Sequence, residues 1–252
     1  MVTLYTYHDY SPPDISHFAI SQSLAGLKKR REFCPNKRDP IKVEHIVAIY
    51  EQLHCIPVEA RACFWAACLV AFFTLLRKSN LFREAGNNRY LRRSDFLIQG
   101  SSAYLRIQQL KTVQFKSAHT LLPLPQAGNH QFCPVSAIIL LLQNTRSSSH
   151  DPLFSYMSGA EVVPLSARAF VRWLREVLAK AFLPTKAISC HSFRRGAATF
   201  AAASNIHPDA LKAQGLWKSS CFERYINRSP ELREQFVAQL SSALQCMDVQ
   251  CN

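Results

Sequence analysis

The sequence contains no pair of cysteines with the CxxC spacing of structural zinc sites, although it has nine cysteines. It also lacks a basic segment followed by an apolar one at its start, so MVTLYTYHDYSPPD is not a signal peptide. The longest apolar run, CFWAACLVAFFTLL at 63–76, is too short to span a membrane and predicts a buried core helix. We therefore expect an intracellular protein with reduced thiols and no membrane partner, nuclear in a eukaryote and otherwise cytoplasmic.

Acidic residues are scarce relative to basic ones. The chain has 17 Asp and Glu against 30 Lys and Arg, which gives a formal net charge of +13. Such a surplus predicts a polyanionic partner. Charge alone allows nucleic acid or, as second choice, an anionic membrane surface, and we expect nucleic acid. Apolar residues make up 48% of the chain, which is enough for a substantial core.

Hydrophobic periodicity and turn residues predict a mainly helical chain with one small three-stranded antiparallel sheet. Strands are expected at 94–100, 102–110 and 118–125, and the first two flank Gly100 in a hairpin. The segment DPLFSYMSG at 151–159 is expected to be a loop. Helices are expected at 21–29, 43–54, 59–77, 134–144, 166–182, 190–204, 208–215 and 230–245, with another short one ending near Tyr225.

The segment KKRREFCPNKRDPIK at 28–42 is linker-like, because it combines many basic residues with two prolines. It is compatible with phosphate binding, with a nuclear import signal or with a solvated linker. The candidate DNA-binding residues here are Lys28, Lys29, Arg30, Arg31, Lys37 and Arg38.

The segment HSFRRGAATFAAASN at 191–205 predicts a helix that begins with basic residues. His191 and Arg194 are three positions apart and share one helix face, whereas Arg195 points elsewhere. Both lie in the first turn, where unpaired N–H groups and the helix dipole favour an anion. A phosphate bound there is physically sensible, and an ordinary helix N-terminus with chance basic residues is the alternative.

Four more residues are candidates for chemistry, each with a structural alternative. Arg77 follows the buried helix and can bind a phosphate or satisfy helix carbonyls. Lys111 follows the second strand and can donate a proton or simply favour solubility. Trp217 can donate from its indole N–H or pack in the core. Tyr225 can act as a nucleophile or be a core aromatic.

The order of these residues resembles that of the tyrosine recombinases, or phage integrases. The matching segments are TLLRKSNL, QLKTVQFK, HSFRRGAA, GLWKSS and FERYI, within a resemblance that covers about 40–245. The tryptophan variant is similar to recombinases of eukaryotic mobile elements of the DIRS and Crypton kinds. The resemblance implies the tyrosine-recombinase catalytic-domain architecture over 41–252. It also implies that 1–40 is a remnant of an N-terminal core-binding helical domain with a basic linker.

The resemblance implies a reaction in which Tyr225 attacks a DNA phosphodiester and forms a 3′-phosphotyrosyl intermediate. Lys111 would protonate the leaving 5′-oxygen, and His191 would accept or shuttle the tyrosine proton. A second DNA end would then attack, so strands are recombined or rejoined. This chemistry conserves the phosphodiester energy and requires no ATP.

The same resemblance assigns the stabilisation of negative charge to Arg77 and Arg194, which would hold the non-bridging oxygens. Trp217 would add a hydrogen-bond donor. Because two arginines supply the positive charge, the reaction needs no metal and no cofactor.

Three positions depart from the family pattern or leave alternatives open. Asn80 stands three residues after the first arginine, where many family members have an acidic residue, and it cannot act as a carboxylate. The tryptophan-to-tyrosine spacing is one residue short, so Leu216 is an alternative to Trp217 for the His-or-Trp position. Lys116 competes with Lys111 for the role of general acid.

The implied partner is double-stranded DNA, bound by a homotetramer that exchanges the C-terminal helix 230–245. Packing of that helix on its own domain is an equal alternative. The remaining candidate DNA contacts are Lys116, Arg195 and Lys218. Rival functions are a recombinase-derived DNA-binding protein without catalysis, a type IB topoisomerase-like relaxing enzyme, and a basic helical scaffold for anionic partners.

Overall fold

The computed structural model describes residues 18–30, 38–86, 89–107, 119–125, 131–217 and 223. Contacts divide the chain into two units, Met1–Lys37 and Arg38–Asn252, which are described separately. The first unit contributes helix α2 (Phe18–Arg30), which confirms the helix predicted at 21–29. No described helix is both long and apolar enough to cross a membrane.

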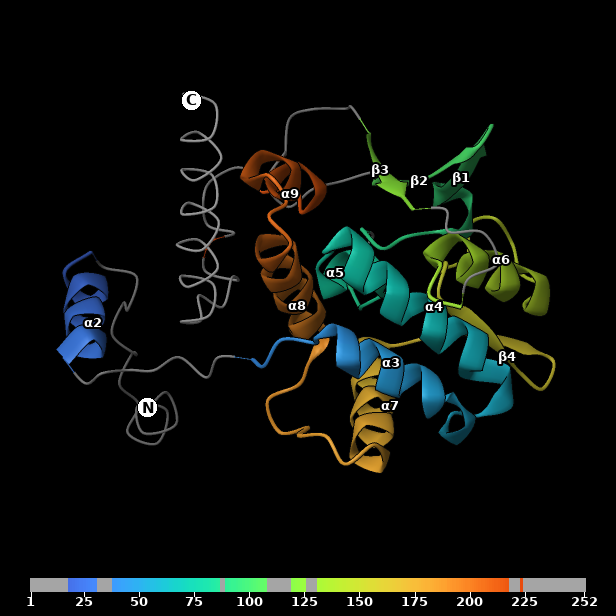
Figure 1. Cartoon of the computed structure of the whole chain (residues 1–252), viewed down its shortest axis with the longest axis horizontal. Helices are drawn as coiled ribbons and strands as arrows, with labels where there is room; N and C mark the ends of the chain where they lie inside the picture. The colour runs from blue at the N-terminus through green and yellow to red at the C-terminus, as the bar shows by residue number, and fades with distance from the viewer. Residues whose placement is uncertain are drawn as a thin grey trace, which may run out of the picture. The chain divides into compact units, whose positions relative to one another are not determined.

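The second unit is built mainly of helices with a small antiparallel sheet at one side (Figure 1). Its described strands are β1 (Phe96–Gln99), β2 (Ser102–Ile107), β3 (Thr120–Leu124), β4 (Ser155–Ser158) and β5 (Glu161–Pro164). Its described helices are α3 (Val43–Glu51), α4 (Val58–Thr74), α5 (Lys78–Leu81), α6 (Pro134–Asn144), α7 (Ala167–Lys180), α8 (Cys190–Ala203) and α9 (Pro208–Gln214), with 3₁₀ turns η1 (Leu53–Cys55) and η2 (Arg93–Asp95). The predicted class, mainly α with a three-stranded antiparallel sheet, is confirmed.

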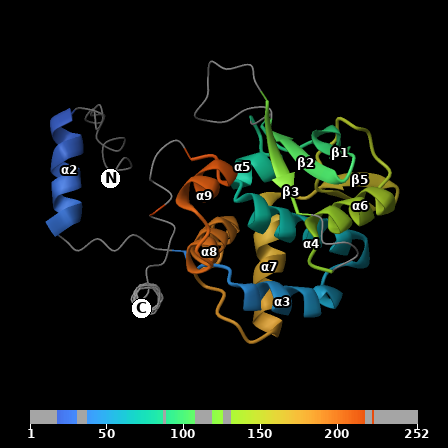
Figure 2. The same cartoon turned by 45° about the horizontal axis from the view of Figure 1, so that its top comes forward.

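Helix α4 is the central element of the second unit and packs against α6, α8 and β4 (Figures 1 and 2). Its side chains are buried on nearly all faces, including Phe64 and Leu69. A helix that is apolar around its whole circumference is stable only inside a core, which is why the sequence predicts its burial. The helix ends at Thr74, and its C-cap residue Leu75 has a left-handed φ of 52°, which stops the helix before Arg77.

The three-stranded sheet has the order β1-β2-β3 with antiparallel pairing throughout. Alternate residues Ala103, Leu105 and Ile107 of β2 are buried, as the period of two in a strand requires. Gly100 makes the predicted hairpin turn with a φ of 58°. Pro123 lies on the edge strand β3, where the absence of an N–H donor is tolerated.

The sequence predicts a loop over 151–159, and this prediction is wrong for the second half of the segment. Residues Ser155–Ser158 form β4, which pairs antiparallel with β5. The turn between them contains Gly159 with a φ of 61°. These strands are too short for a clear alternating pattern. They are held by pairing with each other and by the packing of β4 against α4.

Helices α7, α8 and α9 all end in a left-handed residue that is not glycine. These residues are Phe182, Asn205 and Leu216, with φ values of 57°, 55° and 54°. In each case the next N–H bonds back to the last turn, at 2.9 Å in α7 and α8 and 3.0 Å in α9. This is the Schellman arrangement. It fixes the direction of the chain after each helix, including the chain that leads to Trp217.

Helix α8 approaches the segment before α3 very closely. Ile41 N–H donates to the Ser192 carbonyl at 2.9 Å, and Asp39 N–H donates to the Ala187 carbonyl at 3.2 Å. A Cβ atom at Gly196 would overlap the backbone of Ile41. Glycine is therefore required at this position so that the segment carrying Arg38 can lie against the start of α8.

Candidate active site

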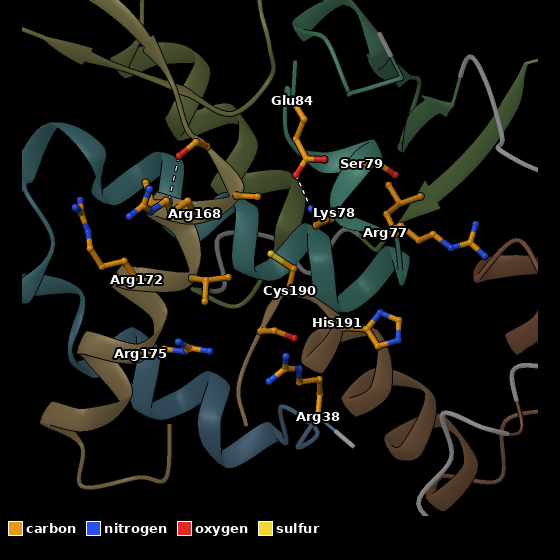
Figure 3. Close-up of a pocket in the computed structure, with 16 residues that line it drawn as sticks. Arg38, Arg77, Lys78, Ser79, Glu84, Arg168, Arg172, Arg175, Cys190 and His191 are labelled. Carbon is orange, nitrogen blue, oxygen red and sulfur yellow. Dashed lines mark hydrogen bonds and ion pairs between the residues drawn. The ribbon is translucent and has the colours of Figure 1, made fainter. Parts of the chain in front are cut away.

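Arg77 is held where two helices meet. Leu75 and Leu76 are buried at the end of α4, and Arg77 is the N-cap residue of α5. The Arg77 carbonyl accepts the N–H of Asn80 at 2.9 Å, so the backbone of Arg77 is part of the first turn of α5. The half-buried Arg77 side chain lines a pocket together with His191 (Figure 3). Residues from two distant parts of the chain therefore line the same pocket.

The start of α8 is fixed by a capping box. Ser189, the N-cap residue, donates its N–H to the Ser192 hydroxyl at 3.0 Å, and the Ser189 side chain caps the helix in return. His191 follows in the first turn with an exposed side chain that lines the pocket. Arg194, one turn later, is only 2% exposed. The two residues predicted to share a helix face thus lie at different depths.

The guanidinium group of Arg194 bridges the ends of two helices. Its Nη1 donates to the Leu75 carbonyl at the end of α4, and its Nη2 donates to the Gly215 carbonyl at the end of α9, at 2.9 Å. A buried cation requires such partners, because an uncompensated buried charge is strongly unfavourable. Arg194 therefore joins the segment that carries Arg77 to the segment that follows α9.

Trp217 covers this buried cation. The Cζ of Arg194 lies 3.8 Å from the centroid of the Trp217 ring, and Trp217 is 5% exposed. A Cβ atom at Gly215 would overlap the Trp217 ring, so glycine allows the ring to fold back over the end of α9. Trp217 is also a buried member of the hydrophobic core, and the partly buried Leu216 packs against that core. Of the two alternatives for the His-or-Trp position, the structure puts Trp217 against Arg194.

The pocket has a volume of about 1550 Å³ and lies between α5, α7 and the start of α8 (Figure 3). Its lining is strongly basic. Besides His191, the basic side chains that line it are Arg38, Arg77, Lys78, Arg168, Arg172 and Arg175. Of the described lining residues, only Glu84 is acidic.

The arginines of α7 were not identified from the sequence. Arg168, Arg172 and Arg175 are spaced i, i+4 and i+7, so one helix face carries all three. The Nε and Nη2 atoms of Arg175 both donate to the Ile188 carbonyl, at 3.1 and 2.9 Å, which ties α7 to the chain before α8. The spacing was a usable signal, but only the fold reveals that this face lines the same pocket as Arg77.

The pKa of His191 is lowered from its ordinary value. Partial desolvation is the largest cause, followed by the positive charges of Arg194, Arg77, Arg195 and Arg38. The imidazole is therefore neutral at pH 7 and has a lone pair that can accept a proton. The neighbouring Cys190 thiol is buried, and burial raises its pKa to about 12, so it is an unreactive neutral group.

Asn80 occupies the position where the resemblance leads one to expect an acidic residue. Asn80 is 7% exposed, and its Nδ2 lies 3.5 Å from the Arg89 carbonyl. Its own carbonyl accepts the Leu91 N–H at 2.8 Å. Asn80 thus holds α5 against the chain that leads to the sheet.

Several predicted site residues lie outside the described residues. They are Lys111, Lys116, Lys218, Tyr225, Arg31 and Lys37, and helix 230–245 lies there too. Lys28, Lys29 and Arg30 fall within α2. Arg195 lies on α8, half-buried. Their proposed roles stay predictions.

No group of three His, Cys, Asp or Glu side chains that could hold a metal ion occurs in the described part of the chain.

The fold is that of site-specific recombinases. The structure resembles XerA recombinase with a TM-score of 0.57, at 15% identity over 94% of this chain and 78% of that one. It also resembles XerH site-specific recombinase bound to difH (TM-score 0.55, 13% identity, 84% and 54% coverage). A lambda integrase dimer bound to a COC′ core site gives a TM-score of 0.54 at 15% identity, with 76% and 48% coverage.

The chain spans about half the length of the XerH and lambda integrase chains, 54% and 48% respectively. No family model and no curated protein matches the sequence. The likeness in structure confirms the tyrosine-recombinase catalytic-domain fold that the sequence motifs predict.

Proposed function

We propose that this chain cleaves and rejoins DNA strands through a 3′-phosphotyrosyl intermediate, as the catalytic part of a tyrosine recombinase. The observation that carries this proposal is the basic pocket shared by Arg77 and His191, with Arg194 buried behind it. A phosphodiester is an anion, and its transfer builds negative charge on the non-bridging oxygens. Preorganised cations and a neutral imidazole are the groups that this reaction requires.

In the proposed cleavage step, the phenolic oxygen of Tyr225 attacks the phosphorus while the bond from phosphorus to the 5′-oxygen breaks. His191 accepts the phenolic proton, because the pKa of its imidazole is lowered and it is neutral before the reaction. A lysine, Lys111 or Lys116, gives a proton to the leaving 5′-oxygen. Religation is the reverse reaction, with the 5′-hydroxyl of a second strand as the nucleophile.

The two arginines have different geometries and so different proposed contributions. Arg77 lines the pocket and binds a non-bridging oxygen directly. Arg194 positions the site, since it holds the end of α4 before Arg77 against the end of α9 before Trp217. Its further role as a phosphate ligand, implied by the resemblance, stays a prediction.

The proposed partner is double-stranded DNA, and the net charge of +13 supports it. Of the similar recombinases, XerH and lambda integrase are seen bound to DNA, and lambda integrase also matches as a tetramer bound to a Holliday junction, with a TM-score of 0.52 at 14% identity. By analogy, we propose a homotetramer on DNA with exchange of helix 230–245. We propose an intracellular location, nuclear in a eukaryote.

Covalent capture tests this function without knowledge of the target sequence. The full chain is incubated with a pool of nicked duplexes of random sequence, in which the nick lets the short fragment that carries the freed 5′-hydroxyl diffuse away. The expected result is a protein–DNA adduct that survives denaturation and contains Tyr225. The variant Tyr225→Phe should give none, whereas Tyr104→Phe, on β2 outside the pocket, should match the unmodified chain.

Asn80 favours one alternative, a recombinase-derived protein that binds DNA without cleaving it. An amide replaces the expected carboxylate there, and it is engaged with the Arg89 carbonyl. Salt-dependent DNA binding with no adduct from any nicked duplex would establish this alternative. Adduct formation combined with relaxation of supercoiled plasmid at no preferred site would instead indicate a type IB topoisomerase-like enzyme.

A further inference from the structure

Lys78 and Glu84 form an ion pair inside the basic pocket. The Nζ of Lys78 lies 2.7 Å from Oε1 of Glu84, and both residues line the pocket (Figure 3). Lys78 is the first residue of α5 and follows Arg77 directly. Glu84 comes from the chain just after α5. The pair therefore lies beside the proposed phosphate site.

The Glu84 carboxylate of this pair lies in a pocket lined mainly by cations. The pocket is lined by six Arg and Lys side chains and by Glu84, the single acidic group among the described lining residues. A phosphate that enters this pocket competes with the Glu84 carboxylate, which is already paired with Lys78. A DNA phosphate oxygen can therefore bind Lys78 in place of the Glu84 carboxylate.

Both side chains of the ion pair are exposed enough for Lys78 to exchange Glu84 for another anion. The Lys78 side chain is 58% exposed and that of Glu84 is 34% exposed. Exposed ion pairs contribute little to stability, because water screens them and two flexible side chains must be ordered. The short backbone of α5 stays anchored independently by the buried Leu81 and Phe82. Lys78 can therefore change partners without a change in the fold.

We propose that Lys78 is a further DNA-phosphate ligand of this site and that Glu84 is the internal anion that it exchanges for DNA. In the DNA-free protein Glu84 neutralises Lys78. When DNA enters, a phosphate oxygen replaces the Glu84 carboxylate on Lys78 Nζ. This inference rests on the proposed function, because it requires DNA to bind in the Arg77–His191 pocket.

The ionisation of Lys78 is consistent with a ligand rather than a proton donor. Its hydrogen bond to Glu84 is the main cause that raises the pKa of its ammonium group. The group therefore remains charged near neutral pH and binds anions by attraction. The role of general acid stays with Lys111 or Lys116.

Salt dependence of DNA binding tests the exchange directly. Affinity of the full chain for a random-sequence duplex is measured across a series of salt concentrations for Lys78→Gln, Glu84→Gln and the double variant. Loss of one phosphate contact should reduce the slope of log K against log salt by about 0.9 in Lys78→Gln. Glu84→Gln should bind about two- to fivefold more tightly, since it loses the competing carboxylate.

The double variant separates exchange from simple repulsion. If Glu84 acts by occupying Lys78, removing it in the Lys78→Gln background should leave affinity unchanged. An equal gain in both backgrounds would show that Glu84 only repels DNA, and this would overturn the exchange. Matched controls are Lys180→Gln on α7 and Glu161→Gln on β5, which do not line the pocket and should leave the slope unchanged.

Failure of this inference is distinct from failure of the proposed function. An unmodified chain that forms the Tyr225 adduct while Lys78→Gln keeps the full salt slope would overturn the role of Lys78 alone. A chain that does not bind DNA at low salt would overturn both. Thermal unfolding of each variant should stay close to that of the unmodified chain, since the pair is exposed.

Discussion

The ring of Trp217 lies over the guanidinium group of Arg194, 3.8 Å from the Arg194 Cζ to the ring centroid. Below the ring, the same guanidinium group donates to the carbonyls of Leu75 and Gly215. A cation, an aromatic ring and two helix ends thus form one buried unit behind the pocket. This unit holds the segment before Arg77 in place, so changes in it should affect stability as well as chemistry.

Replacement of Arg194 by lysine should destabilise the protein even though the charge is kept. An ammonium group lacks the planar fork that reaches both carbonyls and stacks beneath the indole ring. We expect the free energy of unfolding to fall by about 2–4 kcal/mol, since hydrogen bonds to charged groups are lost in a buried site. Urea denaturation measures this. Arg172→Lys on the exposed face of α7 is the control, and an equal loss in both variants would contradict the bridging role of Arg194.

The pH dependence of His191 follows from its position among arginines. Its folded-state pKa lies below 6.5, the value that the group has in the unfolded chain, so the unfolded chain takes up the proton first as the pH falls. Its contribution to stability is therefore complete above pH 6.5 and is lost as the pH falls from there towards the folded-state pKa. NMR titration of the imidazole checks this, with His191→Gln to assign the signal.

Bound DNA should shift the same titration in the opposite direction. A phosphate next to His191 stabilises the imidazolium ion, so the pKa of His191 should rise when a duplex is added. A DNA-free pKa at or above 6.5, or no rise with DNA, would argue against the proposed pocket.

The contact between Gly196 and Ile41 predicts a steric effect. In Gly196→Ala the new methyl group would overlap the Ile41 backbone and force α8 away from the segment that carries Arg38. We expect a loss of about 1–3 kcal/mol in the free energy of unfolding, which is typical of overpacking in a core. Amide hydrogen exchange should show faster exchange at Ile41, whose N–H bonds to Ser192.

Gly26→Ala is the control for this substitution. Gly26 lies in α2, and a Cβ atom there has no neighbour within 4 Å. Its replacement should leave the unfolding midpoint of the second unit unchanged. If Gly196→Ala were equally neutral, the close approach of α8 to Ile41 would be wrong.

The sequence was sufficient to predict the elements that depend on local pattern. Apolar residues on all faces identify α4, Ser166 marks the start of the amphipathic α7, and Gly100 marks the hairpin. These features arise from propensity, capping and periodicity within a few residues. Strand β4 was missed because four residues carry too little periodicity to indicate a strand.

The interior of the site could not be predicted in the same way. The partners of Arg194 are the carbonyls of Leu75 and Gly215, 119 and 21 positions away. Because every residue has a backbone carbonyl, the sequence does not indicate which of them accepts a hydrogen bond from Arg194. The motif HSFRRG indicated a cation at Arg194 but not its burial. The relation between the α7 arginines and Arg77 likewise depends on how separate helices pack.

The bridge made by Arg194 also has a consequence for synthesis of the chain. One of its acceptors, Leu75, leaves the ribosome early, whereas Gly215 emerges only after most of the second unit has been translated. Until then the cation lacks one of its two carbonyls and the indole that covers it. An incomplete nascent polypeptide therefore does not assemble this centre until translation has passed Trp217.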